Sequence, residues 1–451
     1  MIRRPPRSTL SSSSAASDVY KRQPQLIADG YQDSEKRNIL IASSFIIIFS
    51  FTFYIASQFQ GAGNALNDTF GLSIVESILL SALVIYTYTY LGGYLAVSIT
   101  DTIQGFLMAF TALIMPLMAI LKIGGFAEFF EKLSTTSGDF LSFSAGNVGL
   151  SAFGLIIGHL GIGMGYFGQP HLLSRFISVR DLKTLEKSRN YALIWFCIVF
   201  TGMWLLGIAG HFMVEDLSNN ENIFFRISNE VFHPAVQGVL LAAVVSAIMS
   251  TADSQVLACT AAITDDIKPE WNQDHATTKK VTIAVAAFAT LISIGGLYVP
   301  GGDSVFQLVV FAVYGLGGVF VPLLITRWAG YKPDTTHSIS MMVAAFSGVF
   351  IWTVLGYDGA DGIFPSVPGM GAAFATHFTL NYMRTPKIAP LGRFKLPKRS
   401  QYGAIAAAII IPFGAVEATY LFGAPESSDS MGGIGDYSIS GTISYETFGN
   451  N

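Results

Sequence analysis

The sequence predicts an all-α, polytopic membrane protein with about 11 transmembrane helices. Three observations lead to that class: 51% of the 451 residues are apolar, only 12% are charged, and long apolar stretches recur along the chain. A soluble protein carries about 25% charged residues, so this chain has too few to cover a water-facing surface. The formal charge of −4 shows no basic excess, which excludes a nucleic-acid binder. The two cysteines, Cys197 and Cys259, provide no disulfide framework.

Eleven apolar segments are long enough to cross the hydrocarbon core of a membrane, which takes about 20 residues in a helix. The stretches between them are polar or rich in Gly and Pro, and the alternating pattern of a barrel strand is not seen. The predicted spans are 39–57, 73–97, 103–122, 148–168, 190–213, 234–259, 280–299, 304–326, 338–356, 363–383 and 402–422.

The basic residues between these spans predict the orientation. When residues 1–23 are set aside, eighteen Lys and Arg fall on one side of the membrane and three on the other. The richer side is expected to be cytoplasmic. We therefore expect an integral protein of the bacterial inner membrane, with the start of the chain inside and the C-terminus outside.

The chain divides into four predicted regions. Residues 1–23 are basic and Ser-rich without the apolar centre of a signal peptide, and they resemble a translated sequencing adapter. Residues 24–38 form a cytoplasmic segment and residues 39–422 the transmembrane domain. Residues 423–451 have four acids and no basic residue, which predicts a flexible external tail.

A glycine-rich run, GHLGIGMGYFGQPH at residues 158–171, interrupts one span. Its Gly163-x-Gly165-x-x-Gly168 spacing matches a dinucleotide fingerprint, but no strand precedes it, so that interpretation fails. Glycines followed by Pro170 are typical of a helix that unwinds within the membrane, where free carbonyls and half-helix ends can face a polar solute. The alternative is close packing of helices through small residues.

A second unusual run, SAIMSTADSQ at residues 246–255, places hydroxyl groups inside an apolar span. Ser246, Ser250 and Ser254 share one helix face, and oxygen atoms are the ligands that a hard cation such as Na⁺ prefers. The alternative is that these hydroxyls bond back to their own helix. Asp253 favours a functional site, because an acid inside the membrane is costly unless it is used.

Asp101, in the run SITDT at residues 98–102, has two interpretations. It could cap the N-terminus of the span at 103–122, or it could be a buried counter-charge for an ion. The sequence favours neither.

Three runs carry a resemblance to a known family: YTYLGGYLAVSITDT ending at Thr102, GMGYFGQPHLLSRF at 163–176 and VVSAIMSTADSQVLACTAAITDDI at 244–267. They are similar to the solute:sodium symporter family, and within it to bacterial sodium/proline symporters, over residues 31–356. The resemblance implies a LeuT-type bundle of two inverted five-helix repeats. It also implies that 39–57 is the third core helix, so that the first core helices are lacking.

The resemblance also implies roles for individual residues. It assigns a sodium site to the Ala247 carbonyl and the Ser250 and Thr251 hydroxyls. A second cation site matches Asp101, Asp253 and Ser254. The solute site matches Tyr166 and Pro170, and we also expect Gln169, which lies between them, and Ile162 there. Ile162 stands where the proline symporters have Trp, and residues 312–322 read AVYGLGGVFVP in place of AWAGFGAAFGP. Both departures fall near the expected solute site.

The function implied is sodium-coupled secondary active symport of a small solute, with proline or a related amino acid expected. The expected partners are the solute, Na⁺ and the lipid bilayer, without nucleic acid. Neither enzymatic chemistry nor a cofactor is expected, and Na⁺ is a co-transported ion. The alternatives are a membrane sensor domain of the same fold, a symporter for a different small organic solute, or an ion channel.

Overall fold

The computed structural model describes residues 22–384, except for residues 30, 137, 143, 145, 180, 215–219, 300–301 and 357–362. Every regular element in that part of the chain is helical, so the predicted all-α class is confirmed. The α-helices are α1 (Gln23–Ile27), α2 (Asp33–Phe70), α3 (Ile74–Ile123), α4 (Phe126–Thr135), α5 (Gly138–Leu141), α6 (Leu150–Gly165), α7 (Pro170–Ile177), α8 (Leu182–Met213), α9 (Ile223–Val231), α10 (Pro234–Ala261), α11 (His275–Gly296), α12 (Val305–Trp328), α13 (Thr335–Val354) and α14 (Ser366–Met383). The shorter turns are η1 (Tyr166–Gly168), η2 (Asn220–Asn222), η3 (Ala262–Ile267) and η4 (Pro269–Gln273).

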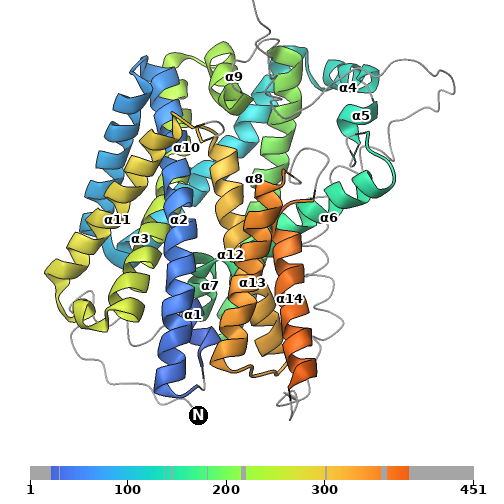
Figure 1. Ribbon diagram of the computed structural model, residues 1–451. Coiled ribbons are helices and arrows are strands. Elements are labelled where there is room, and N and C mark those ends of the chain that lie inside the picture. Colours follow the sequence, from blue (N-terminus) through green and yellow to red (C-terminus); the bar gives the residue numbers. More distant parts are fainter. Residues whose placement is uncertain are drawn as a thin grey trace, which may run out of the picture.

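The long helices stand side by side as a bundle, with α4, α5 and α9 towards the upper end in Figure 1. Within the described residues, eight segments are long and apolar enough to cross a membrane. Ten of the eleven predicted spans fall largely on helices, and the eleventh, 402–422, lies outside the described residues. The eight segments are Asp33–Phe70, Val97–Ile123, Ser151–Gly168, Leu182–Met213, Pro234–Ile267, His275–Gly296, Val305–Trp328 and Thr335–Val354.

The predicted spans 73–97 and 103–122 belong to one continuous helical element. Both lie in α3, whose backbone stays helical over 50 residues from Ile74 to Ile123. In Figure 1 this element runs down from the top of the view and returns upward to α4, so its two halves occupy separate places in the bundle. The polar residues 98–102 ended the apolar pattern without ending the helix, because Ser and Thr can bond to their own helix; Thr100 donates to the Val97 carbonyl at 2.9 Å.

The most buried helix of the bundle is α12. Its sequence is apolar on every face and contains closely spaced glycines, which is typical of a helix surrounded by others. It packs with α2, α10 and α11 into one continuous core. Fully buried side chains of α2 and α12 in this core include Phe51, Ile55, Phe59, Leu316, Phe320 and Leu323.

Side-chain caps fix several helix starts that hydropathy does not detect. Asp181 accepts from the Thr184 N–H, so α8 begins at Leu182 rather than at the predicted residue 190. The charged residues of its first two turns are not apolar, and the hydropathy pattern therefore missed them. Asp274 and Asp334 cap α11 and α13 in the same way.

The start of the chain has some contacts with the bundle. Residues 1–21 lie outside the described part, as do the predicted tail at 423–451 and the span at 402–422. Arg22 pairs with Asp265 and Asp266 at 3.0 and 3.1 Å, and the Gln23 amide donates to the Gly168 carbonyl at 2.8 Å. The last two residues of the adapter-like stretch 1–23 therefore contact the helical bundle.

Candidate cation and solute site

The glycine-rich run breaks its helix, as one of its two interpretations predicts. α6 ends at Gly165, a single 3-10 turn follows, and Gln169 is extended with φ −86° and ψ 119°. α7 then starts at Pro170, where a missing N–H costs nothing because the first turn of a helix has no partner for it. The break replaces the regular pairing of a continuous helix by other contacts: the Gln169 N–H donates to the Tyr166 carbonyl at 3.2 Å, and the Gly168 carbonyl accepts from the Gln23 side-chain amide at 2.8 Å.

The same glycines also pack closely against α12, so the second interpretation holds as well. A Cβ added at Gly317 would lie 2.4 Å from the Cα of Gly165. One added at Gly168 would lie 2.6 Å from the Leu316 carbonyl oxygen. The break is therefore held against the most buried helix of the bundle by backbone-to-backbone contact.

The predicted solute residues lie at this break. Tyr166 is 41% exposed, whereas Gln169 is 1% exposed and Pro170 is buried. The side-chain amide nitrogen of Gln169 has no hydrogen-bond partner among the described residues. The side chain of Ile162 lies outside the described residues. A buried amide donor at a helix break can recognise a carboxylate or carbonyl group.

The three predicted sodium ligands form one cluster of oxygens on α10. The hydroxyls of Ser250 and Thr251 donate to the Ala247 carbonyl at 2.9 and 3.1 Å. This is the local back-bonding pattern that the sequence left as an alternative. It also gathers three neutral oxygens at one point of the helix, which is the ligand chemistry of a hard monovalent cation.

Asp101 and Ser254, predicted for a second cation site, are brought together from α3 and α10 by a third residue. Arg175 of α7 forms an ion pair with the Asp101 carboxylate and donates to the Ser254 hydroxyl at 2.7 Å. The same guanidinium nitrogen makes both contacts. The interpretation of Asp101 as an N-cap is wrong, because Asp101 lies inside α3.

The third predicted member of that site, Asp253, is fully buried at 0% exposure. It lies beside the Ser254 hydroxyl and within electrostatic range of Asp101 and Arg175. Neither of its carboxylate oxygens has a hydrogen-bond partner of good geometry among the described residues. The three side chains and Arg175 thus form one charged cluster inside the bundle.

Arg175 was missed as a site residue, because the predicted loop 169–189 assigned it to the cytoplasmic surface. Residues Pro170–Ile177 are instead the helix α7, and the Arg175 side chain points back to α3 and α10. A signal was present in the sequence. Pro170 at a helix start followed by the amphipathic run HLLSRF predicts one more helical turn before the loop.

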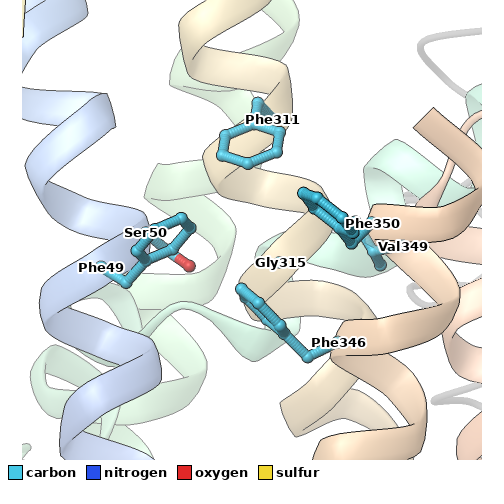
Figure 2. A pocket seen from close by; sticks show the side chains of 7 residues that line it. All are labelled: Phe49, Ser50, Phe311, Gly315, Phe346, Val349 and Phe350. Atoms are coloured by element: carbon cyan, nitrogen blue, oxygen red, sulfur yellow. The ribbon is translucent and has the colours of Figure 1, made fainter. Parts of the chain in front are cut away.

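Two apolar recesses lie elsewhere and do not match a polar solute. Figure 2 shows the first, with a free volume of about 10 Å³, where Gly315 of α12 lies against Ser50 of α2 beside a group of Phe rings. The second has about 280 Å³ and is lined mainly by apolar side chains of α2, η3 and α11, with Trp271. Neither has the charged or multiple polar groups that a zwitterion needs.

The fold and this site define a helical membrane transporter. A broken helix at a buried polar position, beside hydroxyls and acids on neighbouring spans, is the arrangement by which such bundles bind a solute and an ion. In agreement, the sequence pattern of the Sodium:solute symporter family matches residues 23–328. The chain belongs to this family, and it is a sodium-coupled symporter rather than an enzyme.

Several curated relatives match most of the chain. The osmoregulated proline transporter of Bacillus subtilis is 29% identical over 73% of this chain and 67% of its own length. A sodium/proline symporter of Staphylococcus saprophyticus is 32% identical over 77% of this chain and 70% of its own. The Escherichia coli sodium/proline symporter is 28% identical over 74% and 68%. The chain thus spans about two thirds of the length of these relatives.

A solved structure supports the fold. A Na⁺-coupled sialic acid symporter in a substrate-bound outward-open state covers 82% of this chain and 79% of its own, with a TM-score of 0.61 and 18% identity. The predicted LeuT-type architecture is confirmed by this match.

Proposed function

We propose that the protein carries proline or a closely related amino acid together with Na⁺. The observation that supports this most directly is the break at Tyr166–Gly168, which is followed at once by the buried Gln169, whose side-chain amide nitrogen has no partner among the described residues. Such a site suits a small zwitterion. Two of the relatives are named as proline transporters, and proline is a small zwitterion.

The proposed sodium ligands are the Ala247 carbonyl and the Ser250 and Thr251 hydroxyls. Their gathering on one turn of α10 supports this role. Asp101, Asp253 and Ser254 form a proposed second cation site, supported by the buried carboxylate of Asp253. Tyr166, Gln169 and Pro170 are the proposed solute contacts.

The coupling follows from differential affinity. Na⁺ at α10 stabilises the conformation that binds solute, and solute binding raises the sodium affinity by the same factor. When the inner end opens, both ligands lose contacts and leave. No covalent step is involved.

We place the protein in the bacterial inner membrane with the beginning of α2 inside. The chain links between α10 and α11 and between α12 and α13 both lie in the lower half of Figure 1. These links and the helix ends beside them carry the basic residues Lys268, Lys279, Arg327 and Lys332, which favours a cytoplasmic position for that end.

Competition of unlabelled solutes against labelled proline tests the solute class. The full-length protein in proteoliposomes should take up labelled proline under an inward sodium gradient. Excess unlabelled proline should abolish the signal, and sialic acid should not. Uptake that proline does not inhibit would refute the amino-acid assignment.

A further inference from the structure

Arg175 links three helices at one point of the bundle. It belongs to α7, the second half of the broken helix, and its guanidinium reaches Asp101 of α3 and Ser254 of α10. Its side chain is 37% exposed on the bundle, whereas that of Asp101 is only 10% exposed. The contact therefore joins a buried acid to a more exposed side chain of another helix.

The position of the guanidinium nitrogen matters for the second cation site. A cation held jointly by the Asp101 carboxylate and the Ser254 hydroxyl would lie between these two groups. One nitrogen of Arg175 already contacts both. Two positive charges cannot share that position, so Arg175 and a cation exclude each other there.

The charges of the cluster explain what the positively charged Arg175 side chain contributes when no cation is bound. Asp101 and Asp253 are two acids inside the membrane, and Asp253 has no hydrogen-bond partner among the described residues. Uncompensated buried charges are strongly destabilising. A symporter must pass through a cation-free state in each cycle, and in that state Arg175 supplies one of the missing positive charges.

The contact also connects the cation site to the break. α7 starts at Pro170, directly after the extended Gln169, so any movement of α7 alters the proposed solute contacts. While Arg175 holds Asp101 and Ser254, α7 is fixed to α3 and α10. When the guanidinium leaves, that tether is lost.

We propose that Arg175 is a tethered counter-ion that takes the place of the second cation at Asp101 and Ser254 whenever that cation is absent, so that cation binding releases α7 from α3 and α10. The inference rests on the proposed second cation site and adds its regulation.

The test measures sodium binding and the mobility of α7 in the same purified, membrane-embedded protein. Binding is followed with radioactive Na⁺, and mobility is followed by hydrogen–deuterium exchange of the peptide that covers residues 170–177. Choline chloride replaces NaCl at constant ionic strength as the zero-sodium condition. Arg175→Gln removes the tethered charge, and Arg175→Lys keeps it.

Arg189→Gln is the matched control. It removes the same charge from a partly exposed side chain of α8 that donates to the neighbouring Asn190 side chain. Ser250→Ala with Thr251→Ala is a second control, because it alters only the proposed first sodium site. The backbone carbonyl of Ser250, which accepts from Ser254, is kept in that variant.

In the native protein and in Arg189→Gln, sodium should increase exchange in α7. Arg175→Gln should show fast exchange without sodium and no further increase. Its half-saturating sodium concentration should fall about tenfold, as expected when a competitor that fills the site nine-tenths of the time is removed. Arg175→Lys should lie between the native protein and Arg175→Gln in both measurements.

Three results would overturn the inference. The first is an unchanged or weaker sodium affinity in Arg175→Gln. The second is an α7 that does not respond to sodium in the native protein. The third is a response that disappears in the Ser250→Ala, Thr251→Ala variant, which would assign it to the first site and leave the proposed symport intact. If the Ser250→Ala, Thr251→Ala variant loses sodium-driven uptake but keeps the sodium response of α7, the response belongs to the second cation site and the uptake defect to the first.

Discussion

Gly165 of α6 and Gly317 of α12 pack with their backbones in direct contact: a Cβ on Gly317 would come within 2.4 Å of the Gly165 Cα. Two glycines, one at the break and one on the most buried helix, therefore fix where the proposed solute site lies. Neither position has room for a side chain.

Gly317→Ala should displace the break from α12. Overpacking of this kind costs about 1–3 kcal/mol, so the melting temperature should fall and solute uptake should be lost. Gly163→Ala is the matched control, because a Cβ at Gly163 meets no atom within 4 Å. That variant should keep native uptake and melt at or slightly above the native temperature. Equal behaviour of the two variants would contradict the close-packing account.

Removing the hydroxyls of Ser250 and Thr251 should weaken sodium binding selectively. Each substitution to Ala deletes one of three oxygens gathered on α10, and the double variant should need at least about tenfold more sodium for half-maximal uptake, about 1.4 kcal/mol in binding free energy. Thr376→Ala provides the control, since Thr376 makes the same local bond, to Ala372 at 2.8 Å, in α14. A sodium dependence that changes equally in the double variant and in Thr376→Ala would assign the hydroxyls to helix structure alone.

Gln169→Leu should raise the solute KM and leave the sodium dependence close to native. Leu fills a similar volume but removes the amide nitrogen that has no partner among the described residues. The lost hydrogen bond corresponds to roughly 1 kcal/mol, or about a fivefold rise in KM. Gln237→Leu serves as the control. It removes a side-chain amide of α10 that donates to the Phe232 carbonyl just before that helix. An unchanged KM in Gln169→Leu would exclude this side chain from solute contact.

Asp334 should stabilise the start of α13 through its charge. Burial raises the pKa of Asp334, but the His337 N–H and the Arg384 guanidinium outweigh it and hold the pKa below its usual range. A lowered folded-state pKa means that the stabilisation is complete above about pH 4, the ordinary Asp value, and is lost as the pH falls through the lowered pKa.

Hydrogen exchange in the first turn of α13 measures this effect. Asp334→Ala should accelerate exchange at residues 335–338 at neutral pH, because it loses the cap and the ion pair. Asp334→Asn keeps a capping side chain but removes the charge, so it should restore only part of the protection and should lose the dependence on pH. Full native protection in Asp334→Asn would contradict a role for the charge.

The fold was predictable to a large extent, because apolar length and the distribution of basic residues are strong signals for membrane helices. Two physical effects limited the prediction. Polar residues 98–102 do not end α3, since their hydroxyls bond within the helix. The charged first turns of α8 extend beyond its apolar part and are fixed by the Asp181 cap.

The candidate site was predictable only where its chemistry is local. The glycine-rich break and the hydroxyls of α10 follow from short runs of sequence. The partner of Asp101 does not, because Arg175 lies 74 residues away along the chain and meets Asp101 only through the packing of α7 against α3 and α10. Single-sequence patterns carry no information on such contacts.

The central claim is that a sodium gradient drives solute uptake through the oxygen cluster on α10. Its most direct test is labelled proline uptake into proteoliposomes containing the full-length protein, with an inward Na⁺ gradient compared with an equal K⁺ gradient. The account predicts accumulation above the external concentration with Na⁺ only, and its loss in the Ser250→Ala, Thr251→Ala variant. Equal uptake in Na⁺ and K⁺ would contradict it.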